Sequence, residues 1–490
     1  MIARRFLDTV NKNPHFNLLK TRSKITPKWY NHSRLTLAED INKCQQLLVD
    51  HKIAKNDRVA FRGNNSYDWV TWNLATNGLG AIWVPMYSNQ SSDYSRYILK
   101  DCDAKLLISD EEIKVNNETI PIEYYKNITP NNKGVECTYS ENDIFDPAVL
   151  IYTSGTTGDP KGVTLSNMNI LANISDMHKR FETMDTHLTS LNILPWAHIY
   201  GMTCELYYNM LNDNQIAICS SRENFLKECR EVSPELLYLV PKVMELVKNK
   251  TEKIARVPVL GKLIMPTLLK KLFGGNLQNI FMGGAKLHSD TMHFFETNQI
   301  NICEGYGCSE TSPMISVNHM ESPRNTASVG KILASVEVDI INSEICVSGP
   351  NVMKGYWNKP DETAKVILEK DGRRLYKTGD AGYVKDGYIF FSGRISENYK
   401  MLNGKFVNVN KVETSIKKYL NCNFIIYGEN MDYNILYTDE EVTESMLENI
   451  NSDLESYLRI KKVVVIDFTP YLTPKMSIKR KQVISSNFNS

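Results

Sequence analysis

Residues 152–163 read Y-T-S-G-T-T-G-D-P-K-G-V, and this stretch restricts the possible fold more than any other part of the chain. The residues directly before it, 148–152, form a short apolar run with β-branched members, which is typical of a buried strand. Ser166, just after it, is a suitable N-cap for a helix that continues through Ile174. The sequence therefore predicts a strand, a glycine-rich loop and a helix in this order.

The loop in this stretch carries groups that bind an anion. Its glycines allow backbone N–H groups to come close, its hydroxyl side chains add donors, and Lys161 supplies a mobile positive charge. We interpret it as a loop that holds a polyphosphate, against the alternative of an ordinary turn. It is not a Walker A loop, because Pro160 stands where that pattern has its second glycine and Gly162 follows the lysine.

The chain of 490 residues is too long for one compact core, so we expect two or more domains. Helical and strand patterns alternate through residues 1–145, which favours parallel sheets covered by helices. Strand patterns at residues 424–427 and 463–466, with a helical pattern at 444–458 between them, indicate a small α+β domain. The expected fold class is α/β, with a large domain over residues 1–393 and a small domain over 394–490.

Charge and cysteine usage exclude several classes of protein. The formal net charge of +1 gives no electrostatic reason to propose nucleic acid as a partner. The ten cysteines lack a C-x-x-C pair and metal-ligand spacing with histidine, so neither a zinc site nor a disulfide framework is expected. The sequence has no run of eighteen apolar residues, so we expect no membrane-spanning helix. A reduced, cytoplasmic location fits best.

Residues 255–273 are apolar with interleaved basic side chains, as in a helix that lies on a membrane surface. Two prolines and one glycine interrupt this segment, so we favour a pair of helices packed on the core. Peripheral contact with a membrane surface stays open as the alternative.

Several further segments carry chemically useful residues. Residues 191–202 are apolar with a single histidine, His198, which by itself is more often a core residue than a functional group. The others read G-G-A-K-L at 283–287, I-C-E-G-Y-G-C-S-E-T-S-P at 302–313, L-Y-K-T-G-D at 375–380, S-G-R-I-S-E-N-Y-K-M-L-N-G-K-F-V at 392–407 and L-T-P-K-M-S-I-K-R-K at 472–481. With the polyphosphate loop, this set resembles the acyl-adenylate-forming (AMP-binding) superfamily, and most of all its long-chain fatty acyl-CoA synthetases.

The resemblance implies that ATP, Mg²⁺ and CoA take part in the reaction. Glu310 would help to hold Mg²⁺, which a hard carboxylate oxygen suits, and Ser309 keeps the hydroxyl of the family's usual threonine. Thr156 would contact the magnesium-bound phosphates. The β- and γ-phosphates would be wrapped by Thr153, Ser154, Gly155, Thr156, Thr157, Gly158 and Lys161.

The resemblance also assigns the rest of the nucleotide. Asp380 would accept hydrogen bonds from the ribose hydroxyls, and Arg394 would contact ribose or phosphate near the hinge between the domains. Small residues let a flat ring lie against backbone, and a tyrosine can stack on it. The resemblance implies that the adenine is bracketed by Gly283, Gly284, Ala285, Gly305, Tyr306 and Gly307.

The implied reaction has two steps. A carboxylic acid, expected to be a medium- to long-chain fatty acid, attacks the α-phosphorus of ATP, and the small, mobile C-terminal domain then rotates so that CoA can attack the acyl-adenylate. Trp196, His198 and Gly283 match the acyl-pocket segments, although a core role for Trp196 or His198 stays open. The resulting activity is that of an AMP-forming acid–thiol ligase.

The sequence departs from the family near its C-terminus. Ser477 stands where the family has the lysine that stabilises negative charge during adenylation. We hypothesise that Lys475 substitutes, because a lysine stem is long and flexible. Two alternatives stay open: an acyl-AMP ligase that loads a carrier-protein thiol, and a homologue that binds nucleotide or acyl groups without adenylation.

Overall fold

A computed structural model describes residues 1–23, 25–109, 122–124, 143–153, 159–255, 260–320, 324–420, 422–472 and 478–487. The described residues fall into two compact units. The first unit takes its residues from 1–155, 159–337 and 347–376, and the second takes them from 338–346 and 377–490. The architecture is α/β, as predicted, and the expected domain boundary after residue 393 stays a prediction.

The first unit contains a sheet that combines parallel and antiparallel strands. Its central strands β7, β4, β3, β5 and β6 run parallel, whereas β8 is antiparallel to β7 and β18 is antiparallel to β8. The strand order is β18 (Gly355–Tyr356), β8 (Lys161–Ser166), β7 (Pro147–Thr153), β4 (Ile82–Met86), β3 (Arg58–Arg62), β5 (Leu106–Ser109) and β6 (Ile122–Tyr124).

A second sheet in the same unit is parallel at its centre and antiparallel at its ends. The strand order within this unit is β15 (Lys331–Ile332), β14 (Met314–Val317), β13 (Ile302–Gly307), β12 (Asn279–Met282), β11 (Leu236–Leu239), β9 (Thr189–Asn192), β10 (Gln215–Ile218), β1 (Asn17–Arg22) and β2 (Trp29–Ser33). The short apolar run at residues 279–282 forms the central strand β12.

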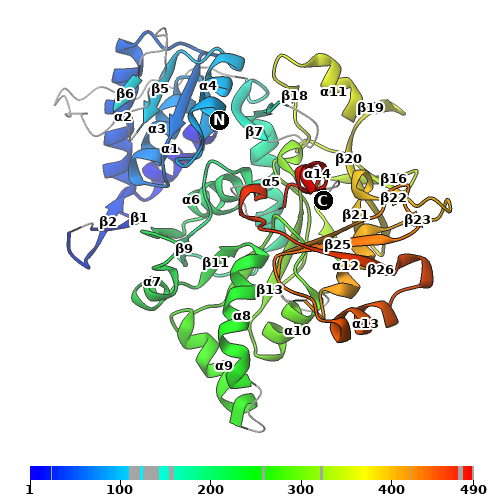
Figure 1. The fold of residues 1–490 in the computed structure, drawn as a ribbon. Coiled ribbons are helices and arrows are strands. Elements are labelled where there is room, and N and C mark those ends of the chain that lie inside the picture. Colours follow the sequence, from blue (N-terminus) through cyan, green and yellow to red (C-terminus); the bar gives the residue numbers. More distant parts are fainter. Residues whose placement is uncertain are drawn as a thin grey trace. The chain divides into compact units, whose positions relative to one another are not determined.

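Helices pack on both sheets, as the alternating pattern predicted (Figure 1). They are α1 (Ile2–Lys12), α2 (Arg34–Asp50), α3 (Tyr67–Gly78), α4 (Ser92–Asp101), α5 (Asn167–Arg180), α6 (Tyr208–Leu211), α7 (Phe225–Val232), α8 (Pro241–Ala255), α9 (Leu260–Leu272), α10 (Ser289–Thr297) and α11 (Pro360–Val366). Shorter elements are the π-helix η2 (Tyr200–Tyr207), the 3₁₀ turn η3 (Ser309–Thr311) and the strand β19 (Ile367–Lys370).

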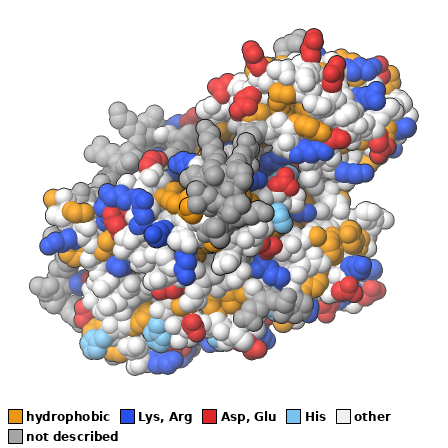
Figure 2. Space-filling model, turned by 90° about the horizontal axis from the view of Figure 1, so that it is seen from below, with side chains coloured by type: hydrophobic (Ala, Val, Ile, Leu, Met, Phe, Trp, Pro, Cys, Tyr) orange, Lys and Arg blue, Asp and Glu red, His pale blue; other side chains and the backbone are white. Residues whose placement is uncertain are grey.

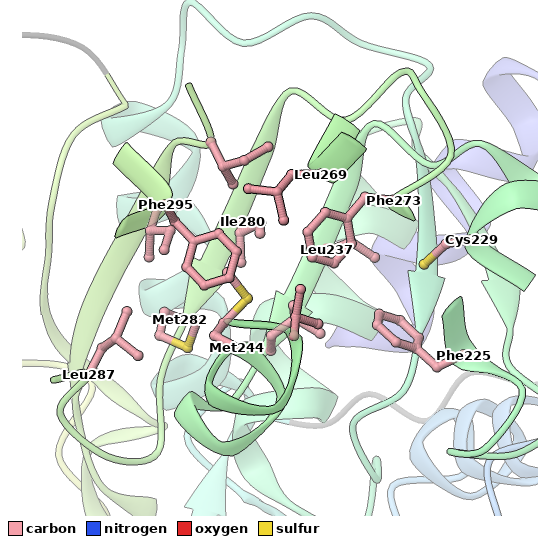
Figure 3. Packing of buried hydrophobic residues seen from close by; sticks show 14 of the residues in the cluster. Phe225, Cys229, Leu237, Met244, Leu269, Phe273, Ile280, Met282, Leu287 and Phe295 are labelled. Carbon is pink, nitrogen blue, oxygen red and sulfur yellow. The ribbon is translucent and has the colours of Figure 1, made fainter. Parts of the chain in front are cut away.

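The apolar strands β11 and β12 are buried because helices cover them. Leu237 and Ile280 from these strands pack with Met244 of α8, Phe273 and Phe295 in one continuous cluster. Figure 3 shows these side chains filling the space between the strands and the helices. This rigid layer supports the ends of β12 and β13, from which the functional segments emerge.

The second unit has its own core, built around Val407, Ile416 and Leu436. The predicted helix at residues 444–458 is shorter than expected, because it ends at Ser452 and a 3₁₀ turn follows. Three strands have residues in both units: β16 (Glu337–Ile341), β17 (Glu344–Ser348) and β20 (Arg373–Lys385). The other elements of the second unit are β21 (Tyr388–Arg394), η4 (Ile395–Glu397), β22 (Tyr399–Lys400), β23 (Phe406–Val407), α12 (Val409–Ile416), β24 (Phe424–Tyr427), β25 (Asn434–Thr438), α13 (Glu444–Ser452), η5 (Ser456–Leu458), β26 (Ile460–Val465), η6 (Thr469–Tyr471) and α14 (Arg480–Asn487).

The surface carries charges of both signs. Figure 2 shows Lys and Arg side chains interspersed with Asp and Glu over the visible face, as the net charge of +1 leads one to expect. Within the described ranges, no helix combines the length and the apolar character that crossing a membrane requires.

Candidate active site

The glycine-rich stretch connects two paired strands rather than a strand and a helix. Thr153, at the end of β7, lies opposite Lys161, at the start of β8. Ser166 then caps α5 through a reciprocal capping box with Asn169, which confirms the predicted N-cap. The residues Ser154, Gly155, Thr156, Thr157 and Gly158, predicted to contact phosphate, lie outside the described residues.

Lys161 is held by residues that come much later in the chain. Its ammonium forms an ion pair with Glu362 of α11 and lies 5.1 Å from the centroid of the Tyr356 ring. Glu362 also pairs with Lys365, and hydrogen bonds from Lys161 and then Lys365 lower the pKa of the Glu362 carboxyl to about 2. The charge of Lys161, the predicted phosphate-binding cation, is thus balanced by a carboxylate.

The strand β18 brings these partners to Lys161. Tyr356 pairs with Val163 of β8, and the next backbone N–H, from Trp357, donates to the Gly162 carbonyl over 2.7 Å. A Cβ atom on Gly162 would lie 3.0 Å from the ring of Tyr152, so a glycine suits this crowded crossing. Backbone pairing with Gly162 and Val163 therefore positions Tyr356 next to Lys161.

Glu310, the predicted magnesium ligand, lies on the 3₁₀ turn η3. Its Oε1 accepts a hydrogen bond of 2.9 Å from the Tyr356 hydroxyl. Burial, followed by the charge of Glu310, holds the pKa of Tyr356 above its ordinary value, so this tyrosine remains a donor. Tyr376 continues the chain of hydrogen bonds from Tyr356.

The donor set fits magnesium bound together with a nucleotide. Among the residues that the structure describes, no three His, Cys, Asp or Glu side chains are grouped so that they could hold a metal by themselves. Mg²⁺ commonly binds through one or two carboxylates plus substrate phosphates and water. Glu310 alone therefore matches a metal that arrives with the polyphosphate, rather than a metal in an all-protein cage.

The two predicted adenine segments follow neighbouring parallel strands. Met282 of β12 pairs with Glu304 of β13, so Gly283 and Gly305 emerge at the same edge of the sheet. The Glu304 carboxylate accepts the backbone N–H of Leu287 over 2.7 Å and so ties the two segments together. Burial raises the pKa of Glu304 to about 7.

Packing explains two of the predicted glycines. A Cβ atom on Gly283 would come within 3.1 Å of the Tyr200 ring, and one on Gly307 would lie 1.8 Å from the Pro313 carbonyl oxygen. Gly307 is thus required by the chain itself, whereas Gly283 leaves room for a ring. Gly284, Ala285 and Gly307 are exposed, and Gly305 and Tyr306 are half-buried.

The predicted acyl-pocket residues lie between β9 and the π-helix η2. Trp196 is fully buried and packs against Trp69 with ring centroids 5.5 Å apart. His198 is half-buried, and its Nδ1 accepts the backbone N–H of Tyr200 over 3.3 Å. Through the contact of Tyr200 with Gly283, this segment meets the first adenine segment.

Asp380 and Arg394 belong to the second unit, where they face each other across β20 and β21. Arg394 Nη1 lies 2.9 Å from Asp380 Oδ1 and also donates to the Thr378 carbonyl over 3.1 Å. The two predicted ribose ligands therefore form one ion pair, in which Asp380 is buried and Arg394 is exposed. Lys475 and Ser477 lie outside the described residues.

The sequence patterns missed Tyr356, Glu362, Glu304 and Glu205. Tyr356 and Glu362 stand in no recognisable motif, and only pairing with β8 places them beside Lys161. Glu304 and Glu205 did have a signal, because each is a lone acid in an otherwise apolar strand or helix.

Comparisons with known proteins identify the family and the fold of this chain. Residues 11–357 match the family described as AMP-binding enzyme. The chain is 24% identical to the long-chain-fatty-acid CoA ligase FadD15 of Mycobacterium bovis, covering 93% of this chain and 91% of that protein. It is also 24% identical to tyrocidine synthase 3 of Brevibacillus parabrevis, covering 91% of this chain but 7% of that protein.

Among solved structures, the chain resembles o-succinylbenzoate coenzyme A synthetase (MenE) from Bacillus subtilis in complex with ATP and magnesium ion. The TM-score is 0.81 at 20% identity, and the match covers 98% of each chain. This likeness confirms the predicted fold. ATP, Mg²⁺ and CoA, the predicted cofactors and substrates, are consistent with the matched family and its relatives.

Proposed function

Because this chain belongs to the AMP-binding enzyme family, we propose that it is an AMP-forming ligase that joins a carboxylic acid to CoA. In the first step, a carboxylate oxygen of the acid attacks the α-phosphorus of ATP, and the bond to pyrophosphate breaks. In the second step, the CoA thiolate attacks the carbonyl carbon of the acyl-adenylate, and AMP leaves. Neither step needs a covalent bond to the enzyme, so the side chains position the reactants and neutralise charge.

The observation that carries this proposal is that Lys161 and Glu310 both contact the same side chain, that of Tyr356. The ring of Tyr356 lies 5.1 Å from the Lys161 ammonium, and its hydroxyl donates to Glu310 over 2.9 Å. A metal-bound polyphosphate presents negative oxygens and a cation at neighbouring positions. A lysine and a carboxylate held side by side match this pattern of charge.

Each of these residues has a role in the proposed first step. Lys161 would exchange Glu362 for phosphate oxygens and so neutralise charge on the leaving pyrophosphate. Glu310 would hold Mg²⁺, which supplies further neutralisation of the phosphate oxygens when it is bound. We retain the adenine role of the segments after β12 and β13, and the ribose role of Asp380 and Arg394.

For the acid, we propose a medium- to long-chain fatty acid. The resemblance to FadD15, which is named as a long-chain-fatty-acid ligase, supports this choice over most of both chains. MenE, whose fold is similar, is named for o-succinylbenzoate instead. The family therefore accepts acids of different classes, and the acid has to be found by experiment.

A carrier-protein thiol is the second candidate acceptor, supported by the similarity to tyrocidine synthase 3. The third candidate, a protein that binds nucleotide without adenylation, is favoured by the serine at position 477.

Peripheral membrane contact is a separate proposal. The helices α8 and α9, which pack on each other, expose Leu246 and Ile264 together with Lys250 and Lys270. Co-sedimentation with anionic vesicles tests that contact.

The function is tested by pyrophosphate release from ATP and Mg²⁺ with acids from acetate to oleate. Release that depends on a long-chain acid, followed by thioester formation with CoA, supports the main proposal. Thioester formation only with an added carrier protein identifies the second candidate. ATP binding without release for any acid supports the third.

A further inference from the structure

The segment that precedes η2 is fixed by a small network of side chains. We name residues 194–200, which include Trp196, His198 and Tyr200, the acyl-pocket segment. Asn65 Nδ2 donates to the Leu194 carbonyl over 2.6 Å, and its Oδ1 accepts the Trp196 backbone N–H over 2.8 Å. Asn192, the last residue of β9, donates to the same Leu194 carbonyl over 2.9 Å. Two amides therefore set the path of this backbone.

Glu205 holds one of these two amides. Its Oε2 accepts a hydrogen bond of 2.5 Å from the same Asn192 nitrogen, while Asn65 donates to Asn192 Oδ1 over 2.5 Å. Glu205 therefore anchors a chain that runs through Asn192 to Asn65 and so to Leu194 and Trp196. It lies on η2, a π-helix, which is a local geometry that is frequent at functional sites.

The surroundings of Glu205 suit a neutral carboxyl and not a carboxylate. The side chain is fully buried, and the hydrogen bonds that it receives from Asn192 and from the Trp196 indole only partly offset the effect of burial. Burial raises the pKa of Glu205 to about 8. An ionised carboxylate here would lack a compensating cation, which makes its burial costly.

The titratable groups that face Glu205 do not change this balance. They are Tyr200 and Cys204 on η2, Cys219 after β10 and Tyr238 on β11. Burial holds the pKa of each of these four groups above its ordinary value, so all four are neutral near pH 8. Glu205 is therefore the group in this cluster that changes charge at mildly alkaline pH.

We propose that Glu205, in its neutral form, is a positioning residue that holds the acyl-pocket segment in place through Asn192 and Asn65. The inference rests on the proposed function, because it assumes that this segment binds the acid. Ionisation of Glu205 draws water or a counter-ion into the cluster and loosens residues 194–196. The enzyme then binds the acid more weakly without a change in the chemistry at phosphorus.

The kinetic test measures KM and kcat for the preferred acid between pH 6 and pH 9.5. For the natural enzyme we expect KM to rise above pH 8, approaching about tenfold per pH unit, while kcat changes little. Glu205→Gln keeps a neutral acceptor, so its KM stays within about twofold at pH 7 and does not rise. Glu205→Ala raises KM about tenfold at every pH because the Asn192 donor loses its partner.

Asp176→Asn is the matched control. Asp176 lies on α5, is buried, and accepts hydrogen bonds from the backbone N–H and the hydroxyl of Ser335. The variant removes a buried carboxylate elsewhere and should keep the natural pH profile. A Glu205→Gln variant whose KM rises with pH like that of the natural enzyme would overturn the inference. So would a Glu205→Ala variant with the natural KM at pH 7.

A second measurement separates this inference from the proposed function. Trp196 is buried beside Glu205, so its fluorescence, obtained as the difference from Trp196→Phe, reports on the cluster without any substrate. We expect a change in this fluorescence with a midpoint near pH 8 that Glu205→Gln abolishes. If no acid is activated but this change is present, the proposed function fails and the coupling of Glu205 to the segment stands. A fluorescence signal that is flat in the natural protein contradicts the coupling itself.

Discussion

The Tyr356 hydroxyl donates a hydrogen bond of 2.9 Å to Glu310, and this contact joins two parts of the chain that no sequence motif connects. The same tyrosine places its ring beside the Lys161 ammonium. One residue on the short strand β18 thus sets the distance between the proposed metal ligand and the proposed phosphate-binding cation.

We predict that Tyr356→Phe weakens the use of magnesium and not the fold. Without the hydroxyl, the Glu310 carboxylate loses a hydrogen bond of the kind that is worth about 1.5–3 kcal/mol when one partner is charged. The Mg²⁺ concentration for half-maximal pyrophosphate release should therefore rise about tenfold. Tyr30→Phe, at an exposed tyrosine of β2, is the control and should change nothing. Equal magnesium dependence in both variants would contradict this role for Tyr356.

If Lys161 binds the phosphates of ATP, as we propose, Glu362 competes with them, because both offer negative oxygens to the same ammonium. Glu362→Gln should therefore lower KM for ATP by about threefold, a modest effect because the pair is partly exposed to solvent. Since its pKa is lowered to about 2, Glu362 is ionised throughout the assay range, and the effect should be equal at pH 6 and pH 9. Glu337→Gln, which breaks the exposed pair with Arg373, serves as control. A raised KM in Glu362→Gln would show that the carboxylate instead orients Lys161 for ATP.

Glu304 makes the stability of the first unit depend on pH. Its raised pKa of about 7 means that the folded chain holds this proton more tightly than the unfolded chain, whose ordinary value is 4.5. The associated stability is complete below pH 4.5 and is lost as the pH rises through 7. Glu304→Gln does not titrate and keeps an acceptor for the Leu287 N–H. The Tm of this variant, measured relative to that of the natural protein, should therefore increase between pH 5 and pH 8.

The control for this measurement is Glu39→Gln, at an exposed glutamate of α2. It should follow the natural protein at every pH. A constant difference in Tm between Glu304→Gln and the natural protein would mean that Glu304 is charged in the folded state at all of these pH values.

Local signals predicted much of this fold. The apolar run at residues 148–152 lies in β7, and Ser166 caps α5, because burial of a short strand and capping of a helix depend on neighbouring residues. Apolar periodicity did not place the end of α13, since Ile450, Leu454 and Leu458 all face the core although the helix ends at Ser452. The helical spacing of apolar residues continued to Leu458, whereas the backbone left the α-helix after Ser452.

The parts of the site that depend on distant pairing were not visible in the sequence. Strand β8 stands where a helix was expected directly after the loop, although its partner β7 is close in the sequence. Tyr356 was missed because β18, the other neighbour of β8, comes nearly two hundred residues later. The partner of Lys161 could not be predicted for the same reason, since Glu362 is 201 positions away. Motifs indicated the residues that we propose to contact ligands, and tertiary structure was needed to find the residues that hold them in place.

The last prediction concerns the lysine that the family has at position 477. If Lys475 takes over its role, Lys475→Ala should slow pyrophosphate release at least tenfold, because negative charge at the α-phosphate then lacks its cation. The double variant Lys475→Ala with Ser477→Lys should recover the rate, because the two positions are only two residues apart and a lysine stem is long and flexible. Lys461→Ala, at an exposed lysine of β26, is the control. Thioester formation from a preformed acyl-adenylate should be unchanged in Lys475→Ala, and a natural rate of pyrophosphate release in that variant would assign the charge to another residue.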